Sequence, residues 1–180
     1  RNRAIALTGG DGVCLLTQDA RPMDPGSLRA IVSAFDDPAI DGAYARQFPL
    51  PDADPILKER LARWSASRDE KVVQTLAPGD PEGAQRVFDG LPPMERYLRC
   101  AFDDVASAVR KSSWERIPLP DRPFGEDVAW ARQTLLAGGS IAFEPDAKVE
   151  HSHPISIKRE LKRLYLSLIH ISEPTRPLHI

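Results

Sequence analysis

The chain has 180 residues and a formal net charge of -2 at pH 7, with 42% hydrophobic and 28% charged residues. This size and composition suffice for one globular domain with a buried core. The charge balance argues against a nucleic-acid-binding protein, because such proteins carry a strongly basic surface. The sequence contains neither an apolar run of 18 residues nor a signal peptide, so no membrane-spanning segment is predicted.

The elements predicted for the first half of the chain alternate between helices and strands. Residues 2–7 are typical of the end of a helix that stops at Gly9 and Gly10, and the chain has no initiator Met, so we expect a preceding segment to be missing. Residues 12–17 form an apolar run typical of a strand buried on both faces. Further elements are a helix from Asp24 and Pro25 to Phe35, a strand over 41–48 and a helix over 55–65.

The second half begins with residues 71–94, which are rich in Gly, Pro and charge and therefore predict a surface loop or insertion. The elements expected after it are a short helix or strand over 95–102, a strand ending at Arg110, a helix opened by Ser112 or Ser113, a helix over 126–137 with Val128, Ala131, Leu135 and Leu136 inward, two short strands over 140–143 and 147–150, and a basic helix over 155–165. Alternating helices and strands predict an α/β sheet whose ligands bind beyond the carboxyl ends of the strands.

The last fifteen residues, 166–180, read LSLIHISEPTRPLHI. Over 166–176 they match the translation of a sequencing-library adapter, although a natural tail broken by Pro174 and Pro177 is the alternative. We therefore expect residues 1–165 to be the partial domain and residues 166–180 to be a non-native tail. His170 and His179 are accordingly left out of any predicted site.

Several polar residues at predicted element ends are candidates for chemistry. Asp19 follows a strand, where a carboxylate is either a turn former or a metal ligand. Glu126 and Asp127 begin a helix, where they could simply cap it or could supply the fixed carboxylate that a general base requires. His151 and His153 alternate on a strand end and face the same side, so with one Asp they could hold zinc or iron, or be structural. Cys14, in an apolar run, and Cys100 lack CxxC spacing, which favours reduced, structural thiols in a cytosolic protein.

Five segments in order resemble bacterial family 2 glycosyltransferases with the GT-A fold, most closely the rhamnosyltransferase-like branch: RNRAIALTGGDGVCLLTQDARP, GAYARQFP, ASAVRKSSWERIPLP, FGEDVAWARQTLLAGGSIAFEPDAKVEHSH and SIKRELKR. The resemblance implies a Rossmann-like mixed sheet flanked by helices. It also implies that the nucleotide-binding β-α-β part, which would precede Arg1, is missing. A fragment of this kind is expected to fold marginally, bind donor poorly and be inactive.

The resemblance also implies roles for individual residues. Thr17, Gln18 and Asp19 match the DXD motif, with Thr17 in place of the first Asp, so that Asp19 and His151 become the expected ligands of Mg²⁺ or Mn²⁺. Asp127 matches the base that deprotonates the acceptor, and Glu126 helps to shape the site. Residues expected near the donor are Arg1, Asn2 and Gln18, and those expected on the acceptor side are Arg46, Gln47 and Trp114.

The implied reaction is inverting transfer of a sugar, with rhamnose as the expected sugar, in polysaccharide assembly. The donor would be a nucleotide-sugar such as dTDP-rhamnose, and the acceptor a glycan or a lipid-linked glycan. The expected location is the cytoplasm at the inner face of the membrane, which the basic helix could touch unless it is merely solvated. Two alternatives are a degenerate, non-catalytic GT-A binding module, which Thr17 favours, and a metallohydrolase using Asp19, His151 and His153.

Overall fold

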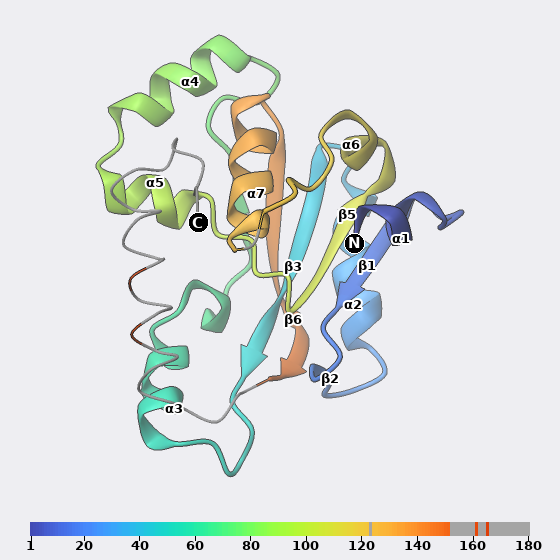
Figure 1. Cartoon of the computed structure of the whole chain (residues 1–180), viewed down its shortest axis with the longest axis vertical. Helices are drawn as coiled ribbons and strands as arrows, with labels where there is room; N and C mark the ends of the chain where they lie inside the picture. The colour runs from blue at the N-terminus through green and yellow to red at the C-terminus, as the bar shows by residue number, and fades with distance from the viewer. Residues whose placement is uncertain (123, 152–160, 162–164, 166–180) are drawn as a thin grey trace.

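A mixed sheet forms the centre of the computed structural model, which describes residues 1–122, 124–151, 161 and 165 (Figure 1). Within these residues the sheet has six strands in the order β1-β5-β3-β6-β2, and β4 also pairs with β6. Strands β3 and β6 are parallel, and the other pairs are antiparallel. The strands are β1 (Gly12–Leu16), β2 (Arg21–Pro22), β3 (Ile40–Phe48), β4 (Val72–Gln74), β5 (Ala106–Arg110) and β6 (Ser140–Glu150). The α/β class with a mixed sheet is confirmed.

Helices flank this sheet on both faces. They are α1 (Asn2–Ala6), α2 (Ser27–Ser33), α3 (Pro55–Ala62), α4 (Pro81–Gly90), α5 (Pro93–Arg99), α6 (Lys111–Arg116) and α7 (Glu126–Leu136), with short 3-10 turns η1 (Ala34–Asp36) and η2 (Ser65–Ser67). The N–H of Gly26 donates to the Asp24 carboxylate, so this acid makes a tight turn, and α2 begins later than the sequence predicted. None of the helices in the described part of the chain is long and apolar enough to cross a bilayer.

The side chains of β3 alternate between two cores because successive residues of a strand point to opposite faces. Tyr44 packs with Phe102 and Trp130 on the face that α7 covers. Ala43 and Ala45 belong to the second cluster, on the face that α2 covers with Ile31. The indole Nε1 of Trp130 donates to the carbonyl of Ile117, and its ring leaves no room for a Cβ at Gly42. The resulting close approach of α7 to β3 fixes the helix against the sheet.

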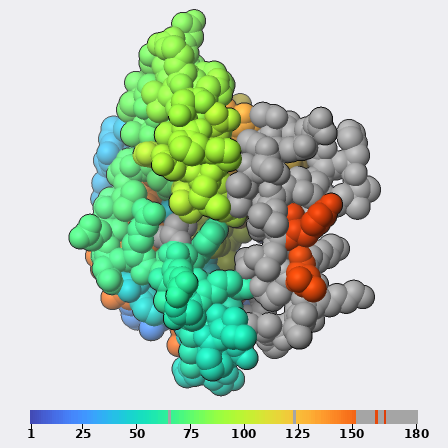
Figure 2. Space-filling model, turned by 90° about the vertical axis from the view of Figure 1, so that its left-hand side faces the viewer, coloured from blue at the N-terminus to red at the C-terminus, as the bar shows by residue number. Residues whose placement is uncertain are grey.

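The structure differs most from the sequence prediction over residues 71–94. They contain β4, which pairs with β6, and the amphipathic helix α4, rather than a surface loop. The Asp80 carboxylate accepts from the N–H of Gly83 and Pro81 occupies the first turn, which is a strong helix start. Phe88 is 2% exposed, so α4 packs firmly. Figure 2 shows α4 and α5 together above α3 on one side of the molecule.

Several smaller predictions were also wrong. Strand β1 was predicted to be buried on both faces, but it is an edge strand with the alternating exposure of a half-buried strand. Cys14 on this strand is exposed, and both cysteines are free thiols. Strand β6 is continuous, because a register irregularity against β3 absorbs the segment around Pro145 that was predicted as a turn. The four residues of α7 predicted to face inward do so, with Ala131 and Leu135 buried and Val128 and Leu136 partly buried against the core, but the prediction missed the buried Trp130 and Thr134. Helix α6 begins at Lys111 without the predicted serine cap.

The predicted basic helix over 155–165 lies outside the described residues, apart from Leu161 and Tyr165. His153, His170, His179 and the predicted tail over 166–180 lie outside them as well.

Candidate active site

The carboxyl ends of β1, β3 and β6 lie at one end of the sheet, together with the amino end of β5. This follows from the pairing, because β5 runs antiparallel to β1 and β3, whereas β6 runs parallel to β3. We call this the site end. It gathers Asp19 after β1, Gln47 near the end of β3, His151 after β6, and Asp103 and Asp104 before β5. Ligands of open α/β sheets bind at such carboxyl ends.

Asp19 and His151, the two predicted metal ligands, lie close together at the site end. The imidazole Nε2 of His151 is 3.6 Å from Oδ2 of Asp19. The backbone N–H of His151 donates to the carbonyl of Phe48 at 2.9 Å, which extends the β3–β6 pairing. The short strand β2 pairs Arg21 with Glu150, so the segment just after Asp19 is held beside the end of β6. The sheet itself therefore brings these two side chains together.

The Asp19–His151 pair suits a divalent cation in its chemistry and approximately in its spacing. An ion bound by both atoms at about 2.1–2.3 Å would need them about 3.0–3.5 Å apart, close to the observed distance. Carboxylate oxygen and imidazole nitrogen together suit Mn²⁺ well, and the carboxylate suits Mg²⁺. Within the described residues no three His, Cys, Asp or Glu side chains converge as a metal site, so further ligands would have to come from donor oxygens or water.

Thr17, at the first DXD position, is hydrogen-bonded to the neighbouring strand. Its N–H and its hydroxyl both donate to the carbonyl of Val105, at 3.0 and 3.3 Å. The side chain therefore binds protein in this structure, and Asp19 is the carboxylate of the motif. Gln18, predicted near the donor, lies between Thr17 and Asp19 in the sequence, and its side chain is exposed.

A cluster of carboxylates lies where the amino end of β5 meets the start of α7. The guanidinium of Arg1 forms ion pairs with both Asp104 and Glu126. Asp103 accepts a hydrogen bond of 3.0 Å from the indole of Trp64. Asp127 accepts one of 2.7 Å from the N–H of Val128. We call Asp103, Asp104, Glu126 and Asp127 the acidic cluster.

The acidic cluster raises the pKa of two of its members. Burial, together with the charges of Asp104, Asp103 and Glu126, raises the pKa of Asp127 to about 8, while the hydrogen bond from Val128 opposes the shift. Burial also raises the pKa of Asp104 to about 6, against the lowering effect of Arg1. A carboxylate whose pKa lies near neutrality is well matched to accept a proton from a hydroxyl. Asp127 thus has the electrostatic character of a general base.

Asn2 and Trp114, predicted on the donor and acceptor sides respectively, are hydrogen-bonded to each other. The indole Nε1 of Trp114 donates to Oδ1 of Asn2 at 2.8 Å, and the Asn2 amide donates to the carbonyl of Leu119 at 2.7 Å. These bonds attach α1 to α6 and the loop that follows it. Both side chains therefore have structural partners.

Arg46 and Gln47, the other predicted acceptor-side residues, lie at the opposite end of the sheet from α6, which carries Trp114, because β3 and β5 are antiparallel. Arg46 pairs with Asp69 at 2.5 Å and stacks over Phe48. Gln47 is 5% exposed, and its Nε2 lacks a hydrogen-bond partner among the described residues. The structure thus brings Arg46 and Gln47 to the site end and leaves α6 away from it.

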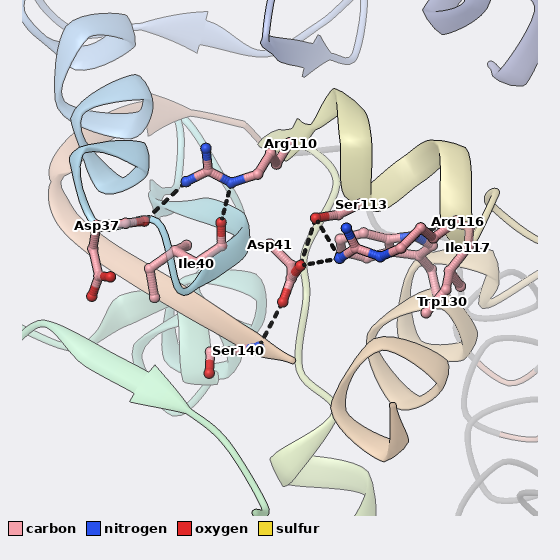
Figure 3. Close-up of polar contacts among 9 residues, drawn as sticks. All are labelled: Asp37, Ile40, Asp41, Arg110, Ser113, Arg116, Ile117, Trp130 and Ser140. Atoms are coloured by element: carbon pink, nitrogen blue, oxygen red, sulfur yellow. Dashed lines mark hydrogen bonds and ion pairs between the residues drawn. The ribbon is translucent and has the colours of Figure 1, made fainter. Parts of the chain in front are cut away.

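A second polar cluster, centred on Asp41, occupies the other end of the sheet (Figure 3). The carboxylate of Asp41 accepts from the hydroxyl of Ser113 at 2.5 Å, the guanidinium of Arg116 at 3.1 Å and the N–H of Ser140 at 2.9 Å. A Cβ at Gly139 would lie 2.3 Å from this carboxylate. Because both of its carboxylate oxygens accept hydrogen bonds from the protein, Asp41 ties the start of β3 to α6 and β6, which is a structural role.

Comparison with known proteins gives a consistent result. The chain is 29% identical over 168 residues to the O-antigen chain rhamnosyltransferase RfbN of Salmonella typhimurium strain LT2. It is 28% identical over 168 residues to the O-antigen chain rhamnosyltransferase WbaN of Salmonella anatum. The chain is similar to rhamnosyltransferases. Each alignment covers 92% of the chain but 49% of the relative, so this rhamnosyltransferase-like chain spans about half the length of the curated relatives it matches.

No protein-family model matches the chain, but the resemblance to rhamnosyltransferases read from its sequence is confirmed by these relatives. Within the rhamnosyltransferase-like chain, Asp103 and Asp104 are residues of the site end that the sequence prediction missed. The available signal was two adjacent acids directly before a strand, but only the pairing of β5 with β1 places them near the other candidates.

Proposed function

We propose that the protein containing this chain is a glycosyltransferase that transfers a sugar, with rhamnose as the sugar, from a nucleotide-sugar such as dTDP-rhamnose. The acceptor is a hydroxyl of a glycan or lipid-linked glycan, used on the cytoplasmic side of the membrane. The similarity to O-antigen rhamnosyltransferases supports the reaction class. The observation that carries the proposal is the position of Asp127, with its raised pKa, at the same end of the sheet as the Asp19–His151 pair.

On the donor side of the reaction, Asp19 and His151 would bind Mg²⁺ or Mn²⁺. When bound, such an ion supplies positive charge that neutralises the diphosphate leaving group. Asp19 is the more exposed of the two side chains, so it can contact a ligand entering from solvent. The hydrogen bond from the backbone N–H of His151 to the carbonyl of Phe48 holds the main chain of His151 beside the end of β3.

The acceptor side falls to Asp127. Its ionised carboxylate takes the proton of the acceptor hydroxyl while that oxygen forms a bond to the anomeric carbon of the sugar. The bond from this carbon to the diphosphate oxygen breaks, and its electron pair leaves with the nucleoside diphosphate. Arg1 pairs with Glu126 and Asp104, and the indole of Trp64 donates to Asp103, which leaves Asp127 as the carboxylate of the acidic cluster available for the proton. One base with no enzyme nucleophile gives inversion by a single displacement.

Replacement of Asp127 by Asn in the full-length protein tests this proposal. The variant keeps the size of the side chain but cannot accept the proton, so we expect turnover to fall by about 100-fold or more with donor affinity retained. Steady-state kinetics and titration with the nucleotide-sugar measure the two quantities. The matched control is Asp121→Asn, an exposed loop carboxylate, which should leave turnover unchanged. Turnover of Asp127→Asn equal to that of the control would exclude Asp127 as the base.

A further inference from the structure

A small pocket lies between α5 and α7, next to α4, on a different face of α7 from Asp127. Three arginines line it, Arg96, Arg122 and Arg132, together with the rings of Phe88 and Tyr97. The adjacent residues of α7 in its wall are Val128 and Ala129. We call it the arginine pocket.

Two of the three guanidinium groups of the arginine pocket are held in place by packing. Those of Arg132 and Arg96 lie 5.1 and 5.6 Å from the centre of the Phe88 ring, as cation–π contacts. Arg96 also donates to the carbonyls of Leu91 at 2.8 Å and Asp89 at 2.5 Å. Because Phe88 is almost fully buried, its ring is a fixed surface for both cations.

These arginines lack the carboxylate partners that neutralise arginines elsewhere in the chain. Arg86, on the exposed side of α4, pairs with Asp80 and Glu82. Within the described residues, no Asp or Glu forms an ion pair with any of the three pocket arginines. The Nε of Arg132 is buried without an acceptor there. A buried donor left unsatisfied costs about 1–3 kcal/mol, so an anionic acceptor would be favoured in this pocket.

We propose that the arginine pocket binds a phosphate-type anion, either a free phosphate or diphosphate or the phosphate group of a lipid-linked molecule. Guanidinium groups present paired N–H donors that match the oxygens of phosphate, and they keep their charge at any physiological pH. The rings of Phe88 and Tyr97 add an apolar surface beside the charges.

The pocket is connected to the acidic cluster by two packed aromatic side chains. Tyr97 packs on Trp64, with ring centres 6.3 Å apart, and Trp64 donates to Asp103. An anion in the pocket would thus be connected through Tyr97 and Trp64 to the cluster that contains Asp127. Assigning this anion to the acceptor rests on the proposed function, whereas binding of the anion does not.

Calorimetric titration of the whole chain with inorganic pyrophosphate and with farnesyl diphosphate tests the site. A chelator in the buffer removes divalent cations, so the Asp19–His151 pair cannot retain either probe through a metal. We expect Arg122→Gln and Arg132→Gln each to weaken binding about tenfold or more, since each removes a charged hydrogen-bond donor. Arg86→Gln is the matched control and should bind like the unaltered chain. Thermal melts of every variant check that the fold is intact.

The outcomes separate the sources of the anion. Equal affinity for the two probes, lost in both pocket variants, indicates that the diphosphate alone is recognised. Tighter binding of farnesyl diphosphate indicates a lipid-linked source. Absence of pyrophosphate binding, or binding unchanged in Arg122→Gln and Arg132→Gln, overturns the proposal. None of these measurements depends on turnover. A negative result for anion binding can therefore be distinguished from a negative result for the proposed function.

Discussion

Replacing Asp104 by Asn removes the neighbouring charge that contributes most to the raised pKa of Asp127. A neighbouring charge shifts a carboxyl pKa by about 1–3 units, but Arg1 already offsets part of the Asp104 charge. We therefore expect a decrease of about 1 pKa unit, equivalent to about 1.4 kcal/mol. Burial remains the largest cause, so the pKa of Asp127 stays above that of an ordinary carboxyl.

The consequence for the base is a larger ionised fraction at neutral pH. A pKa of about 8 leaves about a tenth of Asp127 ionised at pH 7, and a decrease of about 1 unit raises this to about half. The side-chain carboxyl carbon of Asp127, followed by NMR against pH, measures the shift directly. In the full-length protein, the acid limb of the turnover profile should move to lower pH by the same amount, because the base works in its ionised form.

Stability gives a second measurement of the same interaction. A folded-state pKa above the unfolded value means that the native state binds more protons between about pH 4 and 8, so stability falls as pH rises through this range. Asp104→Asn should make this fall smaller, both because it lowers the pKa of Asp127 and because it removes the carboxyl of Asp104, whose own pKa is raised to about 6, whereas Asp121→Asn, the exposed control, should not change it. An Asp127 pKa that stays the same or rises in Asp104→Asn would refute the electrostatic coupling within the acidic cluster.

Two further predictions concern packing and burial. Gly42→Ala would place a Cβ 2.8 Å from the ring of Trp130, and we expect a loss of about 1–3 kcal/mol of unfolding free energy in denaturant titrations; unaltered stability would contradict the close approach. Burial raises the pKa of both thiols, that of Cys100 to about 12, but only Cys14 is exposed, so a thiol reagent at pH 8 should modify Cys14 much faster than Cys100 in the folded chain. Rapid modification of Cys100, read by mass spectrometry of peptides, would contradict its burial.

The sequence predicted those elements whose patterns are local. Strand β3 and helix α7 have clear ends in the sequence, and both were predicted within one residue at each end. Helix α4 was missed because it has only a short buried stripe, including Ala84 and Phe88, although Asp80 and Pro81 gave a usable start signal. Strand β6 was divided in two because Pro145 favours a turn, and only the irregular pairing with β3 accommodates it.

Site residues could be predicted where they stand in a segment that resembles the family, as Asp19 and His151 do, and not where only tertiary packing gives a residue its neighbours. The Asp19–His151 contact agrees with the expected pair, although its metal remains a prediction. Asp104 was not predicted, because its influence on Asp127 depends on the approach of β5 to the start of α7. Likewise, the mutual hydrogen bond of Asn2 and Trp114 depends on the packing of α1 against α6, which no local pattern encodes.

The contact between Trp130 and Gly42 sets the rotation of α7 about its own axis. Trp130 is three residues after Asp127, less than one helical turn away, and its indole is fixed both by the missing side chain of Gly42 and by the carbonyl of Ile117. Any larger residue at position 42 would turn or lift the helix and so redirect the Asp127 carboxylate. Gly42, in the middle of the sheet, can therefore determine the direction in which the carboxylate of Asp127 points without contacting a substrate.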